Sequence, residues 1–198
     1  MERYIVMRIL LALFLLFVVI FFIVRLAGGG DDAPVTEDVA GIQEEVPFIL
    51  SEQNNPDSTV RFTIVGKTNA PEDHREIRFT ITQTARRAEI LKGYDGEVIK
   101  TLSLPNTPSS YQEFLYAIEA EGYTLERSEP TITDVRGQCS DGKKYLYTSR
   151  LNGVVTTDLW SVSCSRKPGT FGGDRNGIVK LFERQFPDFN DFDRGVRL

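Results

Sequence analysis

An uninterrupted apolar run near the N-terminus limits what this chain can fold into. Residues 9–24 are sixteen apolar residues in a row, bounded by Arg8 and Arg25. As a helix this run would rise about 24 Å, and both arginine side chains can extend to lipid headgroups. We therefore predict a transmembrane helix over residues 9–26, with the lipid bilayer as its partner.

Two alternatives to a membrane anchor are a cleaved signal peptide and a buried helix of a soluble protein. A signal peptide has an apolar region of about 7–15 residues and a small-residue cleavage site. Here the run is longer, cleavage after Ala27 would place Arg25 three residues before the cut, and no cysteine follows to accept a lipid. The sequence favours an uncleaved anchor.

The net charge of −5 comes from one segment. Residues 27–58 carry eight acidic residues and no Lys or Arg, whereas residues 59–198 carry 20 basic and 19 acidic residues. The acidic segment is typical of an extended, solvated tether. An alternative is a strip that binds a basic partner, with residues 48–50 as its apolar anchor. The near-neutral remainder, 59–198, is the expected folded domain.

Arginines around the apolar run predict its orientation. Arg3 and Arg8 precede it and only Arg25 follows, which favours a cytoplasmic N-terminus at residues 1–8. The domain then lies outside the cytoplasm, at the cell membrane. The two cysteines of the chain support this placement, because disulfides persist in oxidising compartments.

Alternating apolar residues predict six strands. The first two runs cover residues 60–65 and 77–82. The next two, 87–92 and 97–104, flank a glycine-containing turn, and the last two, 143–151 and 154–165, flank Asn152-Gly153. Asn-Gly is the signature of a type I′ hairpin turn.

Helical spacing of apolar residues predicts two helices between and after these strands. Ser110 and Glu113 form a capping box for the first helix, and Gly122 ends it. The second helix covers residues 175–185. The fold class is therefore α+β: a two-layer sandwich of a mainly antiparallel sheet of about six strands with two helices on one face.

The Asn152-Gly153 turn also predicts a disulfide. If Leu151 pairs with Val154, opposed residue numbers sum to 305, which places Tyr145 opposite Trp160. Cys139 and Cys164 then point to one face of the hairpin, close enough to be bridged if the strand bends. Closing this loop would stabilise the domain by about 3 kcal/mol.

Outward positions of the strands are rich in basic residues and threonine. If both helices cover the other face, Arg61, Arg78 and Arg150 lie on an open surface that could bind an anionic polymer; the alternative is a solvated face. Nucleic acid is disfavoured because stacking aromatics are missing from these positions. The full set is Arg61, Thr63, Arg78, Thr80, Thr82, Arg87, Lys100, Lys144, Thr148, Arg150 and Thr157.

Two segments near the C-terminus have both a structural and a binding interpretation. Gly172 and Gly173 with Arg175 form a candidate anion nest at a helix N-terminus, or else a plain turn with Asp174 as N-cap. Residues 186–193 space phenylalanines three apart among acids, and either complete the core or dock onto another envelope protein.

No motif of a known catalytic, metal or cofactor site is present in the sequence. One histidine and two cysteines cannot supply a Cys/His zinc finger, and no nucleophile elbow or phosphate-binding loop occurs. We therefore predict a non-enzymatic binding or scaffolding module of the cell envelope that requires no cofactor. The alternative is a small envelope enzyme whose carboxylates are brought together by the fold.

Overall fold

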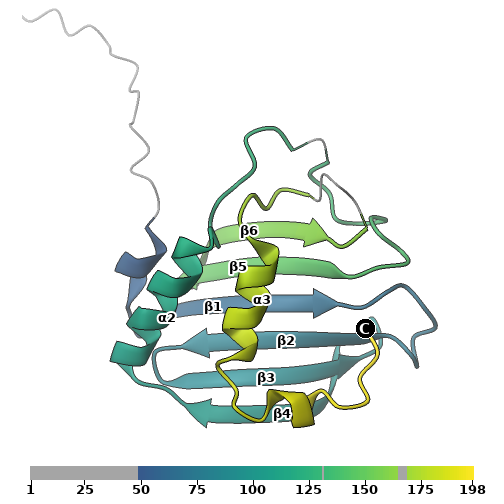
Figure 1. Ribbon diagram of the computed structural model, residues 1–198, viewed down its shortest axis with the longest axis horizontal. Coiled ribbons are helices and arrows are strands. Elements are labelled where there is room, and N and C mark those ends of the chain that lie inside the picture. The colour runs from purple at the N-terminus through teal and green to yellow at the C-terminus, as the bar shows by residue number, and fades with distance from the viewer. Residues whose placement is uncertain (1–48, 131, 165–168) are drawn as a thin grey trace, which may run out of the picture. The chain divides into compact units, whose positions relative to one another are not determined.

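Alternating apolar residues build the six-stranded antiparallel sheet at the centre of the computed structural model (Figure 1). The strands lie in the order β4-β3-β2-β1-β5-β6. The predicted antiparallel sheet is therefore confirmed, with β1 at its centre beside β5. Its strands are β1 (Ser58–Val65), β2 (Arg75–Thr82), β3 (Ala85–Lys92), β4 (Glu97–Pro105), β5 (Lys144–Leu151) and β6 (Val154–Val162).

The structure describes residues 49–130, 132–164 and 169–198. The predicted membrane segment 9–26 and most of the predicted tether lie outside these residues. Among the described helices, none is long and apolar enough to cross a membrane.

The main helices, α2 (Pro108–Ala120) and α3 (Arg175–Glu183), lie on the same face of the sheet (Figure 1). Two short helices, η1 (Leu50–Gln53) and α4 (Phe189–Phe192), complete the described elements. The predicted α+β class with helices packed on the sheet is confirmed.

The start of α2 differs from the predicted capping box. Thr107 is the N-cap, and its side chain accepts a hydrogen bond from the Ser110 N–H at 3.2 Å. Pro108 follows at the first helical position, where its missing N–H is not needed. The predicted end is correct, since Gly122 adopts a positive φ of 75° directly after the helix.

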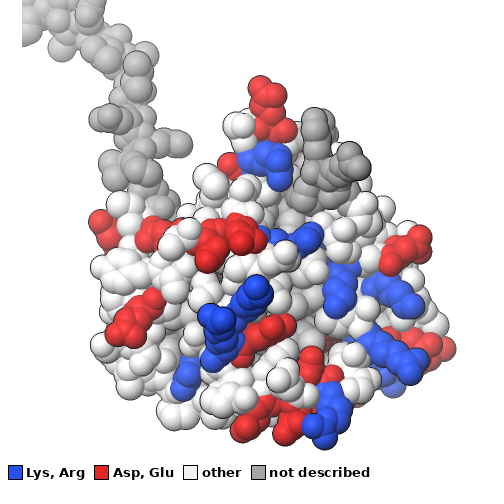
Figure 2. Space-filling model, viewed as in Figure 1, with Lys and Arg blue, Asp and Glu red and all other residues white. Residues whose placement is uncertain are grey.

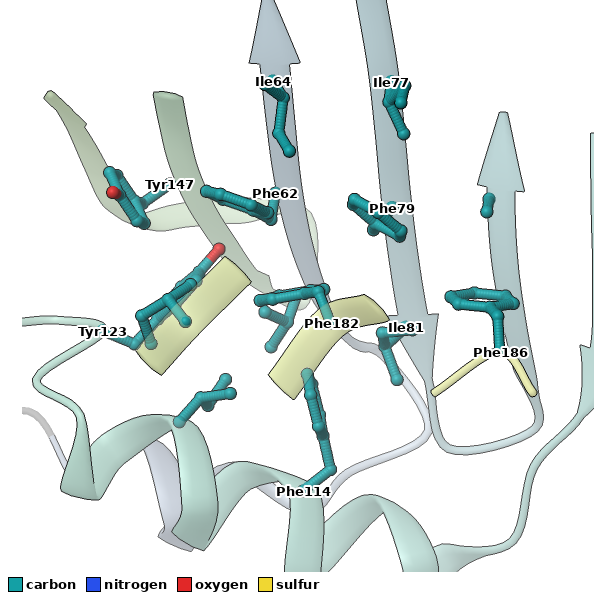
Figure 3. Close-up of a cluster of buried hydrophobic side chains, with 14 of the residues drawn as sticks. Phe62, Ile64, Ile77, Phe79, Ile81, Phe114, Tyr123, Tyr147, Phe182 and Phe186 are labelled. Carbon is teal, nitrogen blue, oxygen red and sulfur yellow. The ribbon is translucent and has the colours of Figure 1, made fainter. Parts of the chain in front are cut away.

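Aromatic side chains from both layers form the core (Figure 3). Phe182 of α3 lies 5.0 Å from Phe62 of β1 and 5.1 Å from Phe114 of α2, measured between ring centroids. Its ring also lies 5.8 Å from that of Phe79 of β2. One residue of α3 thus joins the sheet to the other helix.

Both ends of the described chain add to this core. Phe186, Phe189 and Phe192 are buried, so the C-terminal segment folds back into the core instead of projecting as a docking segment. Leu50 is also buried, and the amides of Leu50 and Ser51 donate to the Glu119 carboxylate at 2.9 and 3.3 Å. The folded domain therefore extends into residues that the sequence assigned to the tether, and Leu50 is not free to anchor a partner.

A bulge in β6 changes the predicted register of the last hairpin. Arg150 and Leu151 pair with Val155 and Val154 as expected, but the register shifts by one residue beyond Ser149. Tyr145 consequently lies opposite Ser161, not Trp160. The extra residue reverses the face on which each following β6 side chain lies.

The predicted disulfide between Cys139 and Cys164 is confirmed. Their Cα atoms lie 5.8 Å apart, within the range of about 4.4–6.8 Å found for disulfides. Cys139 adopts a positive φ of 51°. The bond closes the loop before β5 onto the end of β6 and indicates an oxidising, extracytoplasmic setting.

Candidate functional site

Arginines gather on the face of the sheet opposite to the helices. Arg61 lies opposite Thr80 on β2 and Thr148 on β5, while Arg78 and Arg150 lie two residues away on those neighbouring strands. The three predicted site residues therefore share one face and form a diagonal across three adjacent strands. We call Arg61, Arg78, Arg87 and Arg150 the arginine face, since Arg87 of β3 lies opposite Thr80 in the same row.

The arginine face carries concentrated positive charge. Partial burial lowers the pKa of Arg61, and the positive charges of Arg78 and Arg150 lower it further, while Glu89 acts in the opposite direction. Within the described ranges, none of the four arginines forms a salt bridge with a carboxylate. Glu89 of β3, opposite Arg78, offsets part of their mutual repulsion, but four arginines outnumber it, and an anion placed among them would be attracted.

A buried tyrosine supports this face from below. The Tyr123 hydroxyl donates to the Arg61 carbonyl at 2.6 Å and accepts the Thr148 N–H at 3.1 Å. These bonds come from the helix-covered side and join β1 to β5 beneath the Arg61 side chain. Burial raises the pKa of Tyr123 well above its usual value, so the hydroxyl stays neutral and keeps its proton to donate.

Two of the predicted outward positions are wrong. Thr157 faces the helix-covered side because of the bulge, and it is buried opposite Ser149. Lys100 also lies on that side, since it pairs with the core residue Ile90 and its Nζ donates to the Phe192 carbonyl of α4. The register of β3 and β4 shifts by one residue between Ile90 and Leu91, which turns Lys100 to the helix-covered side, as the β6 bulge does for Thr157. The sequence marks neither shift, so alternation alone misplaced both residues.

Several donors of the candidate anion nest are already engaged. The amides of Gly172 and Asp174 donate to the Leu125 and Glu121 carbonyls at 2.7 and 2.8 Å. Arg175 donates to the Val162 carbonyl and lies over the Tyr145 ring. Asp174 caps α3 through the Asn176 N–H, as predicted for a plain turn.

A pocket of about 860 Å³ lies next to this turn at the edge of β6. Its walls come from the end of α2, from β6 and from the turn before α3, and no Lys or Arg is among its described lining residues. In Figure 2, acidic side chains gather where these helix ends lie in Figure 1. We call this pocket the edge groove; its acidic residues are Glu119, Glu121, Glu126, Asp158 and Asp174.

The carboxyl group of Glu183 lies in an environment that shifts its pKa. Burial raises the pKa of Glu183, and the negative charge of Asp193 adds to this effect. Glu183 lines a pocket of about 370 Å³ between α3 and α4. Within the described part of the chain, no group of three or more His, Cys, Asp or Glu side chains is arranged to hold a metal ion.

The chain was compared with protein-family models and with curated protein sequences. No family model matches it, and no curated protein matches it either.

Proposed function

We propose that this protein is a membrane-anchored binding module of the cell envelope whose arginine face holds an anionic polymer. The observation that carries the proposal is the clustering of Arg61, Arg78 and Arg150 without a salt-bridge partner in the described structure. Residues 9–26 would anchor the module in the membrane, and the acidic tether would hold it at a distance from the bilayer.

The composition of the face fits a repetitive anionic ligand better than a small one. The arginines are spread over four neighbouring strands and alternate with threonine hydroxyls, which can bond to phosphate, sulfate or carboxylate oxygens. A row of spaced cations makes many weak contacts along an anionic chain, so its binding should fall steeply with salt.

The test uses the full-length protein in detergent, loaded on immobilised dextran sulfate. The triple variant Arg61→Gln, Arg78→Gln, Arg150→Gln should elute at clearly lower salt than the unaltered protein. A charge-matched control, Lys180→Gln, Arg184→Gln, Arg197→Gln, removes three exposed cations elsewhere and should elute close to the unaltered protein. Equal loss in both variants would mean that only net charge matters, and would contradict a specific face.

The enzyme hypothesis rests on Glu183, the described carboxyl whose pKa is raised. A proton held on a carboxyl near neutral pH is what a general acid needs. Glu183→Gln should abolish any hydrolytic activity on envelope glycans while leaving dextran sulfate retention unchanged. If the unaltered protein shows no such activity, the enzyme hypothesis is rejected and the binding proposal is unaffected.

A further inference from the structure

The edge groove has a free strand edge along one wall. The backbone N–H and carbonyl of Trp160 in β6 point away from β5. The N–H donates to Thr170 Oγ1, and the carbonyl accepts the Phe171 N–H. Strand geometry repeats every two residues, so the N–H and carbonyl of Asp158 point to the same side. At Asp158 no described strand pairs with this edge, and the groove occupies the position that such a strand would take.

A short ladder already runs along this edge and stops at the groove. Phe171 pairs with Glu126, and the amides of Arg127 and Gly172 donate to the Thr170 and Leu125 carbonyls. This segment covers the edge of β6 at Trp160 but not at Asp158. An extended chain placed in the groove would continue the ladder on β6 by strand addition.

Charge and side-chain exposure define what kind of chain fits. The Glu119 carboxylate accepts the η1 amides, and the Asp174 carboxylate caps α3. The remaining acids form no salt bridge with any described residue; they are Glu121, Glu126 and Asp158. Such a wall attracts lysine and arginine side chains. Apolar contact is available from Leu125 in the groove, which is 55% exposed. Val154 and Val155, which precede the groove residue Thr156 in β6, are 66% and 44% exposed.

A buried hydroxyl gives an independent indication of a missing ligand. Thr157 lines the groove and is only 6% exposed, yet its Oγ1 has no hydrogen-bond partner in the described structure. Buried polar atoms are rarely left without a partner, because this costs about 1–3 kcal/mol. A polar group entering the groove can supply that partner.

We propose that the edge groove binds an extended, lysine- or arginine-containing peptide segment of a partner protein, which adds as a strand to β6 at Asp158. A second copy of this chain is disfavoured as the occupant, because antiparallel pairing of two β6 edges around Asp158 would oppose like charges. The proposal does not depend on the arginine face, whose arginines lie on β1, β2, β3 and β5. The Asp158 side chain lies on that same face, opposite Thr148, but its outward N–H and carbonyl lie at the edge of β6, where the peptide would add.

The probe is a fluorescent, end-blocked octapeptide of alternating lysine and valine, titrated into the full-length protein in zwitterionic nanodiscs. Saturable binding is expected by fluorescence anisotropy at low salt. A glutamate-valine octapeptide should bind at least tenfold more weakly. The lysine-valine peptide with alternate backbone amides methylated should also lose binding, because it cannot complete a ladder.

Two substitutions at one residue separate backbone pairing from charge. Asp158→Asn removes the carboxylate and keeps the N–H, and should weaken binding by about fivefold, the size of an exposed ion pair. Asp158→Pro also removes the outward N–H, which a solvent-facing edge position tolerates, and should weaken binding by a further tenfold or more. The urea midpoint from Trp160 fluorescence verifies that both variants are folded.

Hydrogen exchange gives a readout that does not depend on variants. The Asp158 amide should exchange rapidly in the free protein and slow at least tenfold when the lysine-valine peptide is bound. The triple variant of Arg61, Arg78 and Arg150 should bind the peptide as the unaltered protein does. Equal affinity of the proline and asparagine variants, unchanged exchange at Asp158, or self-association of the protein in place of peptide binding would each overturn the proposal.

Discussion

The Tyr123 hydroxyl offers a direct test of what joins β1 to β5 beneath the arginine face. Tyr123→Phe keeps the ring, which is fully buried, and removes only the oxygen that bridges Arg61 of β1 and Thr148 of β5. Packing should therefore change little. What changes is the hydrogen bonding of two backbone groups in the middle of the sheet.

The magnitude follows from these two bonds. A hydrogen bond contributes about 0.5–1.5 kcal/mol net, and a buried group left without a partner costs about 1–3 kcal/mol. We expect Tyr123→Phe to lower the free energy of unfolding by about 2 kcal/mol, roughly a 30-fold change in the unfolding equilibrium. This is a large share of the about 5–15 kcal/mol that stabilises a typical domain.

Urea titration of the full-length protein in mild detergent can measure the loss. Trp160 is the single tryptophan and is 6% exposed, so its fluorescence reports on the folded hairpin. Tyr147→Phe is the matched buried control: its hydroxyl bonds only to the Ser161 hydroxyl, which can turn to another partner, so about 1 kcal/mol should be lost. Tyr116→Phe, at an exposed position, should lose almost nothing.

A Tyr123→Phe variant no less stable than Tyr116→Phe would refute this reasoning. It would mean that β1 and β5 close directly when the hydroxyl is absent. The arginine face would then be held by the strand ladder alone.

Three further outcomes are expected. Non-reduced peptide mapping should show Cys139 linked to Cys164, and reduction should destabilise the domain by about 3 kcal/mol in urea titrations; free native thiols would contradict the bond. The raised pKa of Glu183 means that the native state holds this proton more tightly than the unfolded state, so stability should fall as the pH rises from about 4.3 through the raised value. Glu183→Gln should lessen that fall, and unchanged pH dependence would assign it to other groups. Asp174→Ala should lose about 1 kcal/mol with the N-cap of α3, measured beside the exposed Asn190→Ala as a near-neutral control.

Local patterns in the sequence were sufficient for most of the fold. Period-two alternation in β1 and β2 buries Val60, Phe62 and Ile64 opposite Ile81, Phe79 and Ile77 in matching register. Short turns then fix the neighbours, because a hairpin leaves few alternatives for pairing. The same alternation places Arg61 and Arg78 on the opposite face.

Features that depend on distant contacts could not be predicted in this way. The bulge in β6 has no glycine or proline to mark it, and it moved Thr157 from the predicted outer face into the edge groove. The groove itself is assembled from three segments, residues 119–126, 156–159 and 172–174. Acidic residues so far apart in the chain look like ordinary surface charge until the helices are packed on the sheet.

The near-neutral charge of the folded domain hides two surfaces of opposite sign. Arginines lie on the outer face of β1, β2, β3 and β5, whereas the carboxylates of the edge groove lie at β6 and the helix ends. Added salt weakens binding to both surfaces, so salt dependence alone cannot tell them apart. The sign of the ligand can distinguish them. If both proposals hold, a polyanion and a basic peptide bind at once without competing, because the arginines lie on β1, β2, β3 and β5 whereas the peptide adds at the edge of β6. Competition between dextran sulfate and the lysine-valine peptide that persists after correction for their own association would mean that they share one surface, and one of the two sites would have to be given up.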